Sequence, residues 1–189
     1  MNGYDLPTSL TIRGVEYRIR SGWRAVMDIF SALSDPEFDD EMKSMAMIRI
    51  LYPDWRSIPF DALLEAAEKA CDFLDCGYGS DKKAGPKTID WTQDASLIVQ
   101  AVNQSANVEI RENPDIHWWT FFGWFMSTEE RLFSTVVNIR NKRASGKKLE
   151  KWEQEFLRKN RSLIEFQRVK TTQDREQDKE VKEYFAKWL

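Results

Sequence analysis

The chain has 189 residues, of which 42% are hydrophobic and 31% charged, and this balance supports a hydrophobic core and excludes a disordered composition. Its length suits one domain, or one domain with an appendage. The net charge of −3 disfavours binding of nucleic acid by the whole surface, and one His with two Cys leaves little material for an enzyme.

The first element that the sequence predicts is a β-hairpin over residues 8–20, where apolar and polar residues alternate. Arg13-Gly14 lies between two alternating runs, and glycine can adopt the positive φ that a tight turn requires. Because an isolated hairpin is only marginally stable, we expect it to pack on helices.

Helical periodicity dominates the rest of the chain, with apolar residues recurring every three or four positions. The predicted helices cover 22–34, 39–51 and 60–75, and others begin at Asp90, at Asn113-Pro114, at Ser127 and near Lys147. Asp90 with Gln93, and Ser127 with Glu130, have the spacing of capping boxes, and residues 77–88 predict an internal loop. The predicted fold is therefore mainly α, with about six or seven helices and a short N-terminal β-hairpin.

Charge divides the chain into an acidic body and a basic C-terminal third. Residues 140–189 contain 15 Lys and Arg against 9 Asp and Glu, a balance of +6, so the remainder carries −9. We predict a helical domain over 1–145 and a basic amphipathic helix and tail over 146–189. The basic third fits a solvated helix face, an arm that binds a protein, or phosphate contacts to nucleic acid, although no nucleic-acid-binding motif is visible.

The sequence shows no residue pattern that is typical of catalysis, a cofactor site or a metal site, so we expect none of the three. His117 has Asp115 two residues away, on a different helix face, and no nucleophile motif accompanies it. Cys71, Cys76 and His117 lack the usual spacing of zinc ligands. Asp90 and Asp94 share a helix face, and we interpret them as a cap and a helix-dipole residue rather than an acid–base pair.

The sequence also shows no pattern that is typical of a targeting signal. The first residues lack the basic and apolar regions of a secretory signal, and no apolar run approaches the roughly 18 residues of a membrane span. We expect a cytoplasmic protein with no membrane partner, whose cysteines stay reduced.

The most unusual stretch is the aromatic segment HWWTFFGWFM, residues 117–126. At helical spacing, Trp118, Phe121, Phe122 and Phe125 form one stripe, whereas Trp119 and Trp124 point elsewhere. A helix that is aromatic nearly all round is buried on several sides or meets a partner, and the sequence leaves both interpretations open.

Several landmarks occur in an ordered set. They are Leu6-Pro7, the hairpin around Gly14 ending in Tyr17-Arg18-Ile19, Trp23-Arg24, Ile89-Asp90-x-x-x-Asp94, His117-Trp118-Trp119-x-Phe121 and Ile139-Arg140. Over about residues 4–145, this set resembles a family of small proteins encoded in the tail module of long-tailed phages and prophages of Gram-positive bacteria. In those genomes the family lies between the major tail protein and the tape-measure protein.

Proteins at that genomic position are usually tail assembly chaperones, and the resemblance implies that role in the cytoplasm of the host bacterium. Such chaperones bind the apolar, helical tape-measure protein while the tail tube polymerises, and they are absent from the finished virion. The implied partner is the tape-measure protein, with the major tail protein and further copies of this chain as additional candidates. The alternatives are a structural tail or connector protein retained in the particle and a nucleic-acid-binding regulator.

A chaperone of this kind requires an adaptable apolar surface, which methionine and aromatic side chains provide. The candidate partner-binding residues are Met42, Met45, Met47, Trp119, Trp124, Trp152 and Phe156.

Overall fold

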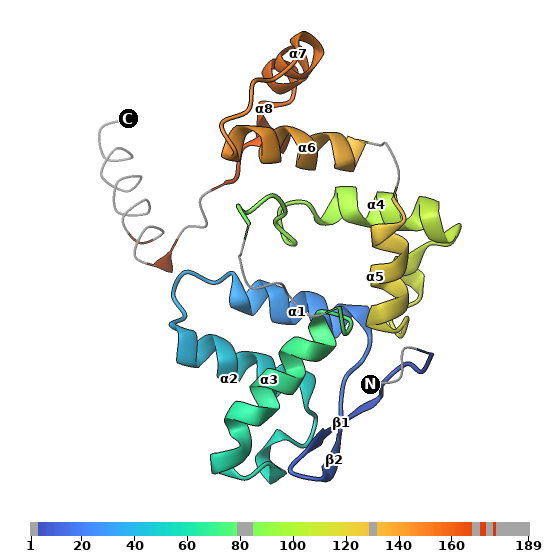
Figure 1. The fold of residues 1–189 in the computed structure, drawn as a ribbon, viewed down its shortest axis with the longest axis vertical. Coiled ribbons are helices and arrows are strands. Elements are labelled where there is room, and N and C mark those ends of the chain that lie inside the picture. Colours follow the sequence, from blue (N-terminus) through green and yellow to red (C-terminus); the bar gives the residue numbers. More distant parts are fainter. Residues whose placement is uncertain (1–3, 79–84, 129–131, 168–170, 173–175, 177–189) are drawn as a thin grey trace, which may run out of the picture.

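The computed structural model describes residues 4–78, 85–128, 132–167, 171–172 and 176. It is mainly helical, with an N-terminal two-stranded hairpin, which confirms the predicted fold class. Figure 1 shows the hairpin, α2 and α3 at one end of the long axis and α7 at the other. In the described part of the chain, no helix combines the length and apolarity needed to span a membrane.

Strands β1 (Ser9–Ile12) and β2 (Val15–Arg18) form the predicted hairpin in antiparallel register, with Ile12 opposite Val15. Both residues of the Arg13-Gly14 turn have positive φ, 49° and 79°. The hairpin rests on α3 (Leu63–Leu74), because Leu10 and Ile12 are buried and the backbone N–H of Arg13 donates to Glu65 Oε1 at 3.1 Å.

Helices α1 (Trp23–Leu33), α2 (Asp40–Leu51) and α3 pack together beside the hairpin. The predicted helix at 60–75 begins later, at Leu63, because the 3₁₀ turns η1 (Trp55–Ser57) and η2 (Phe60–Ala62) precede it. On α2, the buried residues are Met47, Ile48 and Leu51. Met42 is exposed.

Helix α4 (Ala95–Ala106) starts five residues after the predicted start at Asp90, because residues 91–94 form a turn. Asn107, in the left-handed conformation, ends it, and the 3₁₀ turn η3 (Ile110–Glu112) follows. The aromatic helix α5 (Trp118–Met126) likewise starts after the predicted Asn113-Pro114. Of the predicted capping box at Ser127, Glu130 lies outside the described residues.

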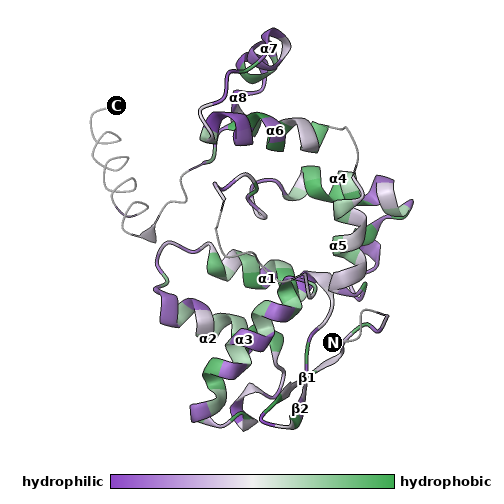
Figure 2. Cartoon of the chain, in the orientation of Figure 1, coloured by the Kyte–Doolittle hydropathy of each residue, from purple (hydrophilic) through white to green (hydrophobic). Residues whose placement is uncertain are grey.

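The C-terminal helices of the fold are attached to helix α6 (Leu132–Ala144). The single helix expected from Lys147 is two helices, α7 (Lys151–Lys159) and the one-turn α8 (Arg161–Ile164), separated at Asn160. Val136, Ile139 and Ile164 form a small core of their own, apart from the main core. Figure 2 shows α4 as largely hydrophobic and α7 as largely hydrophilic, as expected for an inner and an outer helix. The division into 1–145 and 146–189 stays a prediction.

Buried Glu153 anchors α7. Its carboxylate accepts hydrogen bonds from Lys142 Nζ at 2.6 Å and from the backbone N–H of Glu150 at 2.8 Å, and the Lys142 bond holds the pKa of this carboxyl below its usual value. The described part of the chain contains eight α-helices. The last two are attached to α6 through a small core and a buried carboxylate.

Candidate partner-binding surface

His117 joins two segments that are distant in sequence, the start of α5 and the residues before β1. Its Nδ1 accepts a hydrogen bond from the backbone N–H of Trp119 at 3.1 Å, which caps α5. Nε2 therefore carries the proton and donates it to the carbonyl of Pro7 at 2.9 Å. Burial lowers the pKa of this imidazole below its ordinary value. The half-buried histidine thus acts as a structural joint in its neutral form.

The backbone before α5 pairs with the start of α1. The N–H of Trp118 donates to the carbonyl of Ser21 at 2.7 Å, and the N–H of Trp23 donates to Ile116 at 2.9 Å. Gly22 lies between these bonds, and a Cβ at that position would come within 3.2 Å of the Pro114 carbonyl oxygen. Glycine suits this position because the two backbones approach closely, and a Cβ would require the Pro114 carbonyl to shift by a few tenths of an ångström.

Trp118 and Trp119 both bind the carboxyl end of α3. Their indole N–H groups donate to the carbonyls of Leu74 and Phe73, each at 2.9 Å. Carbonyls in the last turn of a helix have no partner within the helix, so the two indoles satisfy them. Trp118 is fully buried, and Trp119 is half-buried against Phe73.

Asp94 and Arg140 form a buried ion pair between the turn before α4 and α6. Arg140 Nη1 and Nη2 lie 2.5 and 2.9 Å from the two Asp94 carboxylate oxygens, and the side chains are 3% and 2% exposed. The same guanidinium donates to the carbonyls of Ile164 and Leu163 in α8. Arg140 therefore uses its fixed fork of donors to hold α6, α8 and the turn together.

Asp90 completes this joint. Its carboxylate accepts hydrogen bonds from the backbone N–H groups of Thr92 and Gln93, so it caps the turn 91–94 and not a helix. The predicted capping box is wrong, because the Gln93 side chain donates to the Glu165 carbonyl and not back to Asp90. Asp94 is the N-cap residue of α4 rather than a residue of its first turn, and its carboxylate binds Arg140 and the backbone N–H of Asp90. Two joints, one around His117 and one around Arg140, thus bring together several of the landmark residues of the sequence.

Beside the first joint lies an open cavity of about 400 Å³, which we call the aromatic hollow. Its lining residues come from α1, from the end of α3, from the turn before α4 and from α5: Phe30, Leu74, Asp75, Tyr78, Trp91, Trp118, Phe122 and Met126. Among these described residues, Asp75 alone is charged. The hollow is therefore an apolar recess with one carboxylate at its edge.

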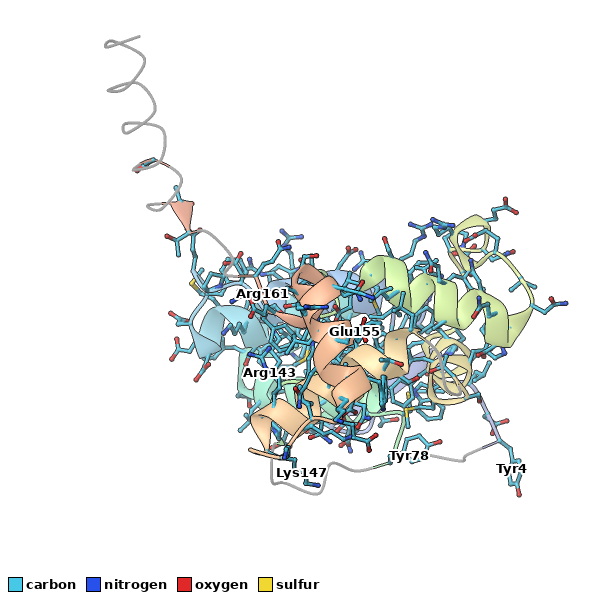
Figure 3. All side chains as sticks on the ribbon, turned by 90° about the horizontal axis from the view of Figure 1, so that it is seen from above. Tyr4, Tyr78, Arg143, Lys147, Glu155 and Arg161 are labelled. Carbon is cyan, nitrogen blue, oxygen red and sulfur yellow. The ribbon has the colours of Figure 1, made fainter. Side chains whose placement is uncertain are left out.

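Packed aromatic rings form the floor of the aromatic hollow, and its rim is exposed. Trp91 stacks on Phe30, with ring centroids 4.9 Å apart, and meets Trp118 edge to face. On the rim, Tyr78 is 81% and Met126 65% exposed, and Figure 3 shows Tyr78 projecting at the edge of the molecule. Large exposed apolar side chains around a recess are typical of a site that binds another molecule.

A second recess, of about 560 Å³, lies on α2 and is called here the methionine hollow. Phe38, Glu41, Met42, Met45, Ala46, Arg49 and Ile50 line it. Two of the predicted partner-binding residues, Met42 and Met45, are thus brought together at the surface. Met47 is 4% exposed and belongs to the main core, so it is not accessible to a partner.

The other predicted residues lie in separate places. Trp124 is half-buried against the main core, and Trp152 is exposed on α7, where its indole donates to Glu150. Phe156 packs against the small core under α7. The seven predicted residues do not form one surface.

None of the eight residues that line the aromatic hollow, which include Tyr78, Trp91, Phe122 and Met126, is among the seven predicted partner-binding residues. The spacing of Phe122 and Met126 puts both on one face of α5, which was the only local signal. Tyr78 and Trp91 come from segments far from α5 in sequence, so only the tertiary structure joins them.

Within the described residues, no three His, Cys, Asp or Glu side chains gather in a way that would hold a metal ion. Cys71 is exposed and Cys76 is half-buried. Burial and the neighbouring Asp75 carboxylate raise the pKa of Cys76 to about 12, so its thiol stays protonated near neutral pH.

Comparison with known proteins gives one family match. The family model described as Bacteriophage Gp15 protein matches residues 4–166, a range that includes both buried joints and every residue lining the two hollows. Neither the curated proteins nor the solved structures gave a match.

Proposed function

This chain belongs to the bacteriophage Gp15 protein family, and from that premise we propose that it is a tail assembly chaperone. In this role it binds the tape-measure protein while the tail tube assembles and is not retained in the virion. The observation that carries the proposal is the aromatic hollow, an exposed apolar recess at the surface of a phage protein. The proposed role needs no cofactor, metal ion or catalytic group.

The chemistry of the aromatic hollow suits an apolar helix face. A helix binds a groove by inserting side chains from one face, and aromatic walls give such side chains a large contact area. The hollow accepts these side chains between Tyr78 and Met126 on its rim, above Trp118 on its floor. A tape-measure protein presents apolar helix faces before the tube encloses it, so it provides matching ligands.

The proposed function also requires release, and the composition of the rim supports it. Met126 has a flexible and polarisable side chain, which adapts to different apolar partners. Tyr78 and Met126 are mostly exposed before binding, so each adds a modest contact rather than a deep anchor. The methionine hollow, with Met42 and Met45, offers a second contact of the same kind.

Co-expression with the tape-measure protein of the same phage, followed by pull-down and light scattering, tests the proposal. We expect the tape-measure protein to stay in solution and to co-purify at a defined ratio. The double variant Tyr78→Ala with Met126→Ala should weaken binding roughly tenfold, which corresponds to about 1.4 kcal/mol, with unchanged thermal unfolding.

The matched control is Val108→Ala, which truncates an exposed apolar side chain that does not line either hollow and should leave binding unchanged. The chaperone proposal fails if the tape-measure protein precipitates while this chain remains alone in solution. If the complex forms but the double variant binds like the wild type, the aromatic hollow is not the binding surface.

A further inference from the structure

One carboxylate lies at the edge of the otherwise apolar aromatic hollow. Asp75 is the C-cap residue of α3, and it is exposed to solvent. The remaining residues that line the hollow are uncharged. Among the described residues, no Lys or Arg side chain forms an ion pair with Asp75. The described part of the chain therefore leaves a negative charge at this recess without a counter-charge.

The stability of α3 does not explain this charge. The carboxyl end of a helix carries partial negative charge, and basic side chains are the ones that stabilise it. The last turn of α3 contains Asp72 and no basic residue, and Asp75 adds a second carboxylate at the same end. Burial of Cys76 and the nearby charge of Asp75 together raise the pKa of that thiol. The end of α3 thus creates a negative potential beside the hollow.

A tight turn after α3 places Tyr78 on the rim close to Asp75. The backbone N–H of Tyr78 donates to the Asp75 carbonyl at 3.1 Å, and Cys76 and Gly77 between them have positive φ, 54° and 73°. Most of the Tyr78 ring is accessible, and Figure 3 shows it projecting from the molecule. The ring centroid of Tyr78 lies 6.4 Å from that of Phe122 on α5. A carboxylate and accessible aromatic rings therefore line the same recess.

Aromatic walls with one carboxylate suit a ligand that combines apolar groups with a cation. The face of an aromatic ring attracts a positive charge, and a carboxylate adds a charge-assisted hydrogen bond. The methylene stem of Lys or Arg covers apolar surface while its charged end reaches a polar partner. A helix with Lys or Arg beside its apolar residues would therefore use both the floor of the hollow and the carboxylate at its edge.

We propose that the aromatic hollow selects a partner helix on which Lys or Arg lies three or four positions from the apolar residues that enter the recess, with Asp75 as the counter-charge. Residues at this spacing share one face of a helix, so the apolar and basic side chains can enter the recess together. An acidic side chain at the same position would meet the Asp75 carboxylate and is disfavoured.

This inference rests on the proposed function and adds which segments of the tape-measure protein bind. Apolar helix faces recur along such a protein, so apolar contacts alone would not distinguish one segment from another. A single charge pair at the edge of the hollow supplies that distinction, because like charges or an unpaired cation weaken the alternatives. The Asp75 carboxylate is exposed, so its contribution to affinity should be modest and should decrease with salt.

An array of overlapping peptides from the tape-measure protein of the same phage, each about 20 residues long, tests the inference. The array is probed with the wild type and with Asp75→Asn, which removes the charge and keeps the size of the side chain. The matched control is Asp72→Asn, because Asp72 is an exposed carboxylate at the same helix end that pairs with Lys69 at 3.8 Å and does not line the hollow. Both changes remove a carboxylate from the negative end of α3, so the fold should survive, and thermal unfolding checks this.

The peptides that bind the wild type should contain Lys or Arg at the proposed spacing from apolar residues. In fluorescence anisotropy titrations, Asp75→Asn should bind these peptides about fivefold more weakly, the upper range for an exposed ion pair, whereas Asp72→Asn should bind like the wild type. A peptide with Gln in place of its basic residue should lose affinity for the wild type by the same factor and should no longer distinguish the wild type from Asp75→Asn.

Three results would overturn the inference and leave the proposed function standing. They are strong binding by peptides without a basic residue, equal binding by Asp75→Asn and the wild type, and an equal loss in Asp72→Asn. Binding of the intact tape-measure protein without any binding peptide would also overturn it, since the hollow would then not recognise a single helix. If no peptide binds and the co-expressed tape-measure protein precipitates, the proposed function fails together with the inference.

Discussion

At the scale of single residues, His117 shows how the two ring nitrogens of one histidine can join separate parts of a fold. Its Nδ1 accepts the N–H of Trp119 and its Nε2 donates to Pro7, so both ring nitrogens are occupied only when the ring is neutral. A second proton on Nδ1 would remove the acceptor that caps α5. Burial opposes the same protonation and lowers the pKa.

This geometry predicts that acid weakens the fold through His117. Because the folded pKa lies below the unfolded value, the neutral ring contributes stability that is complete above the unfolded pKa, about 6.5. That contribution is lost as the pH falls through the folded pKa. Urea unfolding at a series of pH values should show the loss, and it should be smaller in His117→Asn, which keeps a cap but does not titrate in this range.

An NMR titration of the His117 imidazole tests the lowered pKa independently. We expect a pKa below the ordinary value in the folded protein. A pKa at or above that value, or an equal acid sensitivity in His117→Asn, would show that the ring does not couple protonation to folding.

At the scale of elements, Arg140 determines how the C-terminal helices attach. It lies on α6, pairs with Asp94 in the turn before α4, and donates to the carbonyls of Leu163 and Ile164 in α8. The ring of Phe166 also lies 4.2 Å from its guanidinium carbon. The small core under α7 contains only a few buried side chains, so this polar joint is a major part of the attachment.

Removal of one partner of the Arg140 joint should therefore be costly. Arg140→Met leaves the Asp94 carboxylate buried without a counter-charge, and we expect a loss of about 3–5 kcal/mol in the free energy of unfolding. Chemical denaturation measures the loss, and hydrogen exchange should show reduced protection of α6 and α8. The control is Lys159→Met, since Lys159 is in an exposed pair with Glu155 that is worth at most about 0.5 kcal/mol.

The double variant Arg140→Met with Asp94→Asn tests the cause of this loss. If the unpaired carboxylate is responsible, the double variant should be more stable than Arg140→Met alone. Equal stability would assign the loss to the hydrogen bonds with α8 instead.

At the scale of the whole molecule, the fold separates its supporting residues from its exposed apolar surface. The landmark residues around His117 and Arg140 are buried or half-buried, whereas the rim of the aromatic hollow is open to solvent.

The proposed chaperone role predicts the composition of the finished particle. Mass spectrometry of purified virions should not detect this chain, while the major tail protein in the same sample serves as the positive control. Detection at a fixed ratio to the major tail protein would favour the alternative of a structural tail or connector protein. A nucleic-acid-binding regulator would instead show an affinity for nucleic acid that falls steeply with salt.

The sequence by itself determined the class of elements and their order. The alternation of the hairpin and its Arg13-Gly14 turn depend only on neighbouring residues, so local rules were sufficient to predict the hairpin. The helices were predicted correctly from their periodicity for the same reason. The helix boundaries were less accurate, because the starts of α3, α4 and α5 depend on 3₁₀ turns and on side chains that bind distant backbone.

Only the tertiary structure decided which residues meet. Asp94 is 46 residues from Arg140, and Trp118 is 44 residues from the Leu74 carbonyl that it binds. Met42 and Met47 looked equivalent in sequence, yet one lines an open recess and the other is buried. The aromatic hollow likewise requires α1, α3 and α5 to converge. Periodicity indicates that a helix has an apolar face to bury. Packing between distant segments determines which residues cover that face and which faces stay exposed.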